Sequence, residues 1–148
     1  MIFNDSGIDG KTAIVTGGSR GIGREIVKTL AAEGADVTFL YLENHEAAEA
    51  LVTECRASGF AVTARRVDVR SADECSQAVE SVLDRTDRVD ILVNNAGVIR
   101  DNLLPAFTEE EISEVFATNV LGVFHITGRV AQVMMRQRGG SIINISSV

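Results

Sequence analysis

The sequence predicts an α/β fold, a doubly wound parallel sheet of five strands with helices on both faces. Short apolar runs typical of strands alternate with longer segments of helical periodicity. Two of the runs, Ile91-Leu92-Val93 and Ile142-Ile143-Asn144-Ile145, are almost continuously apolar, which favours strands covered on both faces. Strands are therefore expected near residues 11–16, 36–41, 61–67, 89–94 and 141–146.

A glycine-rich turn follows the first expected strand. The segment Thr16-Gly17-Gly18-Ser19-Arg20-Gly21-Ile22-Gly23 lies between Ala13-Ile14-Val15 and a helical stretch. Gly17 can adopt backbone angles closed to other residues, and Gly21 and Gly23 keep side chains away from a ligand or the strand. The amides that open the helix then favour a phosphate, although a plain tight turn is the alternative for an isolated glycine cluster.

The helices have recognisable faces and starts. Ser71-x-x-Glu74 and Thr108-x-x-Glu111 both fit the capping box, so a helix is expected to begin at each. The first helix is expected to end at Gly34. Its predicted sheet-facing stripe consists of Ile22, Ile26 and Leu30, with Val27 and Ala31 beside it.

The strand ends carry the remaining motifs. Right-handed crossovers place the ligand crevice of such a sheet at the carboxyl ends of its strands. Asp68-Val69 follows the third expected strand, Asn94-Asn95-Ala96-Gly97 the fourth and Ser146-Ser147 the fifth. These segments are therefore expected to meet the glycine-rich turn at one edge.

Composition limits the classes of protein. With 148 residues, of which 45% are hydrophobic and 24% charged, residues 1–148 should form one domain with its own core. No apolar run approaches the roughly 18 residues that cross a bilayer, and residues 1–5 do not resemble a signal peptide, so a cytoplasmic location without a membrane partner is expected. The net charge of −7 argues against a nucleic-acid partner.

Cysteines and histidines give little sign of chemistry. Cys55 and Cys75 fall in predicted surface helices without His or Cys at metal-ligand spacing, so half-buried free thiols and no metal site are expected. His45 is interpreted as a helix-start residue and His125 as a helix-face residue, each without a partner that would mark a catalytic base.

Four ordered motifs together resemble the short-chain dehydrogenase/reductase family. They are the Thr-Gly-x-x-x-Gly-Ile-Gly turn, Asp68-Val69, the Asn-Asn-Ala-Gly segment and Asn119 within a later helix. The resemblance covers nearly the whole chain. It implies a Rossmann-type sheet that is truncated before the final helices and strands, and a nicotinamide dinucleotide as cofactor.

The resemblance also implies roles at the cofactor. Asp68 would accept a hydrogen bond from the adenine amino group and Val69 would contribute its backbone, whereas a turn or helix-capping aspartate is the alternative. Asn94 would mainly brace the sheet. The implied cofactor contacts are Gly17, Ser19, Arg20, Gly21, Ile22, Gly23, Tyr41, Asp68, Val69, Asn95, Ala96 and Gly97.

NADP is predicted in preference to NAD. The second strand ends at Tyr41 without a carboxylate before Glu43, and a carboxylate there would repel a 2′-phosphate. Arg20 would supply a guanidinium to that phosphate, unless it is merely a solvated loop charge.

For catalysis, the resemblance assigns Asn119 to a water of a proton relay and Ser147 to orienting the substrate carbonyl. Ser146 is the alternative to Ser147, and an amide that only satisfies backbone groups is the alternative for Asn119. The family's Tyr-x-x-x-Lys is absent, because Tyr41 is the only tyrosine and is followed four residues on by His45. The chain is therefore expected to be the cofactor half of a longer enzyme and to be inactive alone.

Within the family, the chain looks most like 3-oxoacyl-[acyl-carrier-protein] reductases of fatty-acid synthesis. Arg138 matches a position that can meet the acidic carrier protein, and an exposed loop arginine is the alternative. A dehydrogenase of another alcohol or ketone, or a nucleotide-binding protein without catalysis, also remains open. A homo-oligomer is expected from an open sheet edge and an uncovered helix face around Val123, Ile126, Val130 and Val133, with partial disorder as the alternative.

Overall fold

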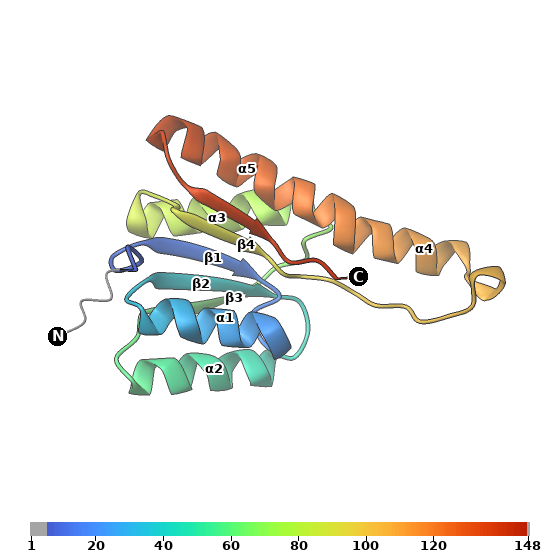
Figure 1. The fold of residues 1–148 in the computed structure, drawn as a ribbon, viewed down its shortest axis with the longest axis horizontal. Coiled ribbons are helices and arrows are strands. Elements are labelled where there is room, and N and C mark those ends of the chain that lie inside the picture. The colour runs from blue at the N-terminus through green and yellow to red at the C-terminus, as the bar shows by residue number, and fades with distance from the viewer. Residues whose placement is uncertain (1–5, 148) are drawn as a thin grey trace.

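The computed structural model describes residues 6–147 and contains one parallel sheet (Figure 1). Its strand order is β3-β2-β1-β4-β5, so the predicted doubly wound sheet of five parallel strands is confirmed. The segment 1–5, which was judged unlike a signal peptide, lies outside the described residues. The strands are β1 (Thr12–Thr16), β2 (Asp36–Tyr41), β3 (Val62–Arg66), β4 (Ile91–Asn94) and β5 (Ser141–Asn144), each within the expected range.

Helices cover both faces of this sheet, as Figure 1 shows. The first two pack on one face with Ala13 and Val15 of β1, and the third and fifth pack on the other face with Ile14. This alternation follows from the side-chain period of two in a strand. The helices are α1 (Gly21–Ala32), α2 (His45–Ala57), α3 (Ala72–Thr86), α4 (Glu109–Phe116) and α5 (Gly122–Gln137), with a short 3-10 turn, η1 (Leu104–Ala106), and a π-helical turn, η2 (Ala117–Leu121).

The predicted inner stripe of α1 is wrong at Ile22, whereas Ile26 and Leu30 pack partly buried against the core. Gly23, Val27 and Ala31 are its buried residues, whereas Ile22 is 65% exposed. Gly23 has to face the preceding turn because a β carbon there would lie 2.1 Å from the carbonyl oxygen of Gly17. This contact sets the rotation of α1 and leaves Ile26 only half-buried.

Two expectations about covered surfaces are also wrong. All four residues of β5 are exposed, since α5 packs mainly against α3 and only lightly against β4. For the same reason the α5 face that was expected to be uncovered is largely buried, because Ile126, Val130 and Val133 contact α3. The exposed apolar residues of the α4–α5 segment lie elsewhere on it, at Ile112, Phe116, Val120, Leu121, Phe124 and Met135.

Both cysteines are free thiols, as predicted, but they are buried rather than half-buried. Cys75 is 0% exposed because it lies on the inner face of α3. Burial raises the pKa of its thiol to about 11. Among residues 6–147, no helix has the length and apolar character needed to span a membrane.

Candidate functional site

The turn between β1 and α1 presents backbone amides at the carboxyl edge of the sheet. Gly17 and Gly21 both have positive φ angles, +66° and +54°, which glycine adopts without strain. A β carbon added at Gly21 would have no atom from other parts of the described chain within 4 Å, so the space above the turn is open. In the described chain no side chain caps the start of α1, whereas Asn44, Ser71 and Thr108 cap α2, α3 and α4.

This arrangement fits a phosphate-bearing cofactor. The first amides of a helix lack intrahelical partners and sit at the positive end of its dipole, so an anion stabilises them. The first turn of α1 carries no acidic side chain, whereas the first turns of α2 and α3 do. Arg20 is exposed beside the turn, while Ser19 is buried.

Residues after β4 hold the glycine-rich turn in place. The Thr16 hydroxyl accepts hydrogen bonds from the backbone amides of Asn95 and Ala96, at 3.0 and 2.9 Å. The Asn95 side-chain amide donates to the Thr16 and Gly17 carbonyls, at 3.2 and 3.0 Å. Asn95 therefore braces the turn, and Ala96 approaches Gly17 so closely that a β carbon at Gly17 would lie 2.9 Å from its Cα atom.

Asn94 joins neighbouring elements, as the sequence predicted for its amide. Its side-chain nitrogen donates to Asn144 of β5 at 2.8 Å and to Thr127 of α5 at 2.9 Å. The pairing continues beyond the strands, since the Ile145 amide donates to the Asn94 carbonyl. Ser146 and Ser147 come next, and both are exposed beyond the carboxyl end of β5.

The loop after β3 is ordered by charges and by a helix cap. The Asp68 carboxylate accepts the Arg70 amide at 2.9 Å and pairs with the Arg70 guanidinium at 2.6 Å. This guanidinium holds the pKa of the Asp68 carboxyl below its ordinary value, so the side chain is an acceptor at neutral pH. Glu74 accepts the Asp68 amide, so the predicted capping box at Ser71 is only half formed, whereas the box at Thr108 and Glu111 is complete.

At the end of β2, Tyr41 and His45 form a hydrogen-bonded pair that the sequence interpretation did not include. Tyr41 is buried among the side chains beneath α1 and α2, and its hydroxyl shares a 2.6 Å hydrogen bond with Nδ1 of His45. His45 does begin α2, as predicted, but it has a partner that was not foreseen. Glu43 remains the first carboxylate after β2.

Asn119 lies where the long helix is locally distorted. It belongs to η2, and its exposed side chain bonds both backbone groups of Val98. A β carbon at Gly97 would lie 3.4 Å from its Oδ1 atom. The segment after β4 and the π-helical turn are thus brought together, as the motif order implied.

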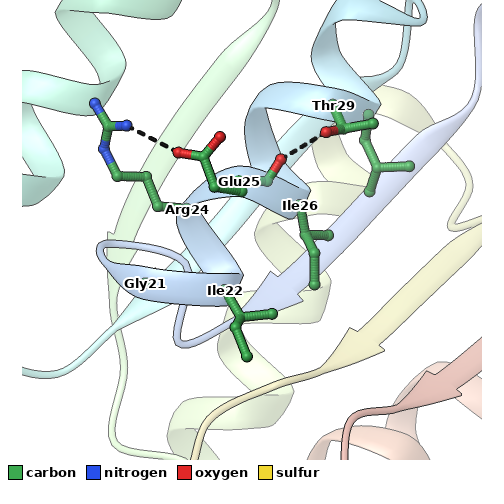
Figure 2. Close-up of a pocket in the computed structure, with 7 residues that line it drawn as sticks. Gly21, Ile22, Arg24, Glu25, Ile26 and Thr29 are labelled. Atoms are coloured by element: carbon green, nitrogen blue, oxygen red, sulfur yellow. Dashed lines mark hydrogen bonds and ion pairs between the residues drawn. The ribbon is translucent and has the colours of Figure 1, made fainter.

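Two further surfaces differ in their distance from this edge, because Arg138 lies apart from it whereas a hollow along α1 begins at Gly21 of the turn. Arg138 is exposed at the end of α5 and precedes the start of β5, so it lies at the amino ends of the strands. An open hollow lies along α1, where Figure 2 shows Ile22 and Ile26 on the opposite side of the helix from Arg24 and Glu25. The residues lining it are Gly21, Ile22, Arg24, Glu25, Ile26, Thr29 and Leu30.

The sequence interpretation missed three residues of the site. Thr16, Glu74 and His125 all make hydrogen bonds to the loops at the carboxyl edge. Thr16 belongs to the glycine-rich turn and Glu74 to the predicted capping box, so both motifs could have indicated these residues. The contact of His125 with Val69 joins residues 56 positions apart and no local pattern announces it.

Comparison with protein families and curated sequences places these residues in a wider context. A family model described as short chain dehydrogenase matches residues 11–148. The chain is 46% identical over 138 residues to the 3-oxoacyl-[acyl-carrier-protein] reductase FabG of Staphylococcus aureus, which covers 93% of this chain and 56% of that protein. It is 43% identical over 138 residues to the 3-oxoacyl-[acyl-carrier-protein] reductase of Synechocystis, with shares of 93% and 56%.

Solved structures give a consistent picture. A short-chain dehydrogenase/reductase from Serratia marcescens superposes with a TM-score of 0.89 at 39% identity, over 95% of this chain and 56% of that one. A variant of actinorhodin polyketide ketoreductase with NADPH gives a TM-score of 0.88 at 35% identity, over 95% and 54% of the two chains. The chain thus spans little more than half the length of the proteins it matches.

Proposed function

Because the chain belongs to the short-chain dehydrogenase family, we propose that it is the NADP-binding part of an oxidoreductase that reduces a 3-oxoacyl thioester. The cofactor would supply the hydride that reduces the 3-keto group. The observation that carries the proposal is the open turn at Gly17 and Gly21, leading into a helix that no side chain caps within the described chain. The chain's share of the work is to bind and orient the dinucleotide.

Each strand end has a part in this binding. The diphosphate would lie on the amides of Gly21, Ile22 and Gly23, with Gly17 and Ser19 shaping the turn. The nicotinamide ribose would lie against Ala96 and Gly97, whose backbone Asn95 and Thr16 hold in place. Asp68 would accept the adenine amino group and the Val69 amide would donate to the ring.

NADP is proposed over NAD because of the charges near the end of β2. Arg20 is exposed within the glycine-rich turn, and Gly18 of the same turn is fixed against β2 by a hydrogen bond to the Leu40 carbonyl. A guanidinium there would pair with the 2′-phosphate. Tyr41 contributes only its position at the strand end, since its side chain is buried.

Titration calorimetry with NADP⁺ and NAD⁺ tests this proposal directly. We expect tighter binding of NADP⁺, and Arg20→Ala should weaken NADP⁺ about tenfold, or about 1.4 kcal/mol, with little change for NAD⁺. Arg56→Ala, which removes an exposed arginine at the end of α2, is the matched control. Tighter NAD⁺ binding, or an Arg20→Ala protein that retains NADP⁺ affinity, would contradict the preference.

Reduction of a ketone also needs a proton donor beside Ser147 and Asn119. Ser147 would orient the substrate carbonyl, and Asn119 would hold the water of a proton relay beside Gly97. The only tyrosine is buried against His45 at the end of β2, away from Ser147 at the end of β5. We therefore expect no measurable NADPH oxidation with a 3-oxoacyl thioester from the 148 residues alone, and steady turnover would overturn this expectation.

Two partners follow from the same proposal. An acyl-carrier-protein thioester would be the substrate, and Arg138 would contact the acidic carrier on a surface apart from the crevice. Charge reversal at Arg138 should weaken carrier binding more than charge reversal at Arg136, and equal effects would count against this contact.

A second copy of the chain is proposed to cover the exposed stripe of Phe116, Val120 and Phe124. Sedimentation equilibrium of the parent and Phe124→Glu proteins tests this proposal.

A second candidate is favoured by the position of Tyr41. A protein that binds the dinucleotide without turnover would need the glycine-rich turn but no proton donor near Ser147. A reductase of a different ketone or alcohol would share the crevice as well. Assaying the complete natural gene product against a 3-oxoacyl thioester and simple ketones separates these alternatives.

A further inference from the structure

His125 connects α5 to the loop after β3. Its Nδ1 atom lies 2.9 Å from the Val69 carbonyl oxygen. Because a carbonyl oxygen only accepts, this ring nitrogen carries the proton and donates. The Cys75 thiol lies on the same oxygen at 3.6 Å, so the Val69 carbonyl is fixed from both α3 and α5.

The side chain of Val69 is fixed by the same helix. A β carbon at Gly122 would lie 2.7 Å from Cγ2 of Val69, so only glycine lets α5 approach this closely. Val69 is 8% exposed as a result. Within residues 6–147 its backbone amide donates to no protein acceptor, and it stands next to the charged carboxylate of Asp68.

These two neighbouring groups have complementary chemistry toward adenine. An amide donor suits the unprotonated ring nitrogen N1, and an ionised carboxylate suits the amino group beside it. Hypoxanthine carries a proton on N1 and an oxygen in place of the amino group, so the same pair rejects it. The discrimination depends on the direction in which the Val69 peptide is held.

We propose that His125 is a positioning residue that sets the Val69 peptide for reading the adenine of the dinucleotide. This inference rests on the proposed function, because it presupposes that a dinucleotide binds at the carboxyl edge. His125 itself need not touch the cofactor. It acts by holding the Val69 carbonyl, and through it the amide donor beside Asp68.

The test uses the 148-residue chain and two ligands, NADP⁺ and its hypoxanthine analogue, each titrated by calorimetry. His125→Leu removes the donor and should weaken NADP⁺ about tenfold while affecting the analogue much less, so the adenine preference falls. In His125→Asn the side-chain amide nitrogen stands near the place of Nδ1, and this variant should restore most of the preference. The melting temperatures of the variants serve as a check on folding.

The outcomes separate the two proposals. If the parent chain binds neither ligand, the proposed function fails and the role of His125 fails with it. If the parent binds NADP⁺ and His125→Leu lowers both affinities by the same factor, the positioning role alone is overturned, because general loosening would not change the preference. A preference that falls in His125→Leu and returns in His125→Asn supports the role.

Discussion

Asn119 holds the backbone of Val98 at both of its polar groups. Its Oδ1 atom accepts the Val98 amide at 2.8 Å, and its Nδ2 atom donates to the Val98 carbonyl at 2.9 Å. The contact joins η2 to the segment after β4, across 21 positions of sequence. The Asn119 side chain therefore fixes the segment after β4 against η2.

Asn119→Ala should loosen this segment. We expect faster hydrogen exchange of the Val98 amide and a loss of about 1 kcal/mol in the free energy of unfolding, since the lost bonds are exposed to water. Asn119→Asp keeps an acceptor for the Val98 amide and is the matched variant, in which protection of that amide should survive. Equal exchange in the parent and Asn119→Ala proteins would contradict this account.

Gly23→Ala should damage the turn that is proposed to receive the phosphate. The added carbon would lie 2.1 Å from the Gly17 carbonyl oxygen and 2.4 Å from Nδ2 of Asn95, so α1 or the turn must move. We expect a loss of about 1–3 kcal/mol in the free energy of unfolding, measured in urea, together with loss of NADP⁺ binding.

Gly128→Ala is the control for this substitution, because no atom from other parts of the described chain lies within 4 Å of the carbon added at this helical glycine. It should raise the free energy of unfolding by about 0.5–1 kcal/mol through helix propensity alone. Similar effects of the two substitutions would show that Gly23 is not required for close approach.

Local pattern was enough to predict much of this fold. Alternating periodicity located the strands within two residues, and the glycine spacing located the turn at Gly17. The rotation of α1 was not predictable in this way, because it depends on the contact of Gly23 with Gly17 and not on the apolar pattern of Ile22 and Ile26. Apolar composition also failed to predict the exposure of β5, since exposure depends on where α5 packs.

In the candidate site too, residues within local motifs were predictable, whereas residues that act through long-range contacts were not. Asp68 and Ala96 were predicted as site residues because each belongs to a short motif of neighbouring residues. The hydroxyl of Thr16 binds amides 79 and 80 positions away, and His125 reaches Val69 across 56 positions. Such contacts are a property of the packed sheet and are seen only once the strands are in register.

Thr16→Val should destabilise the site from beneath. The substitution preserves shape but removes the buried hydroxyl that accepts the Asn95 and Ala96 amides. Two half-buried donors then lack this acceptor, so the free energy of unfolding should fall by about 2 kcal/mol. Thr16→Ser retains the hydroxyl and should protect both amides from hydrogen exchange. If Thr16→Val is as stable as Thr16→Ser, the hydroxyl is not needed as an acceptor.

Cys75 should make the chain less stable in alkali. Burial raises the pKa of its thiol from 9.0 to about 11 in the folded chain, with smaller contributions from Asp68 and Glu74. Below pH 9 the thiol is protonated in both the folded and the unfolded chain, so its contribution to stability is intact. Between these two values only the unfolded chain loses the proton readily, and the free energy of unfolding should therefore fall by about 2–3 kcal/mol as pH rises.

Urea unfolding of the parent, Cys75→Ala and Val79→Ala proteins at pH 8 and at about pH 11 isolates this contribution. Val79 lies on the same buried face of α3 and has no titrating group, so its replacement controls for the cavity. Val79→Ala should lose as much stability as the parent between the two pH values, and Cys75→Ala should lose about 2–3 kcal/mol less. If all three proteins lose the same amount, the thiol ionises as readily in the folded chain as in the unfolded one.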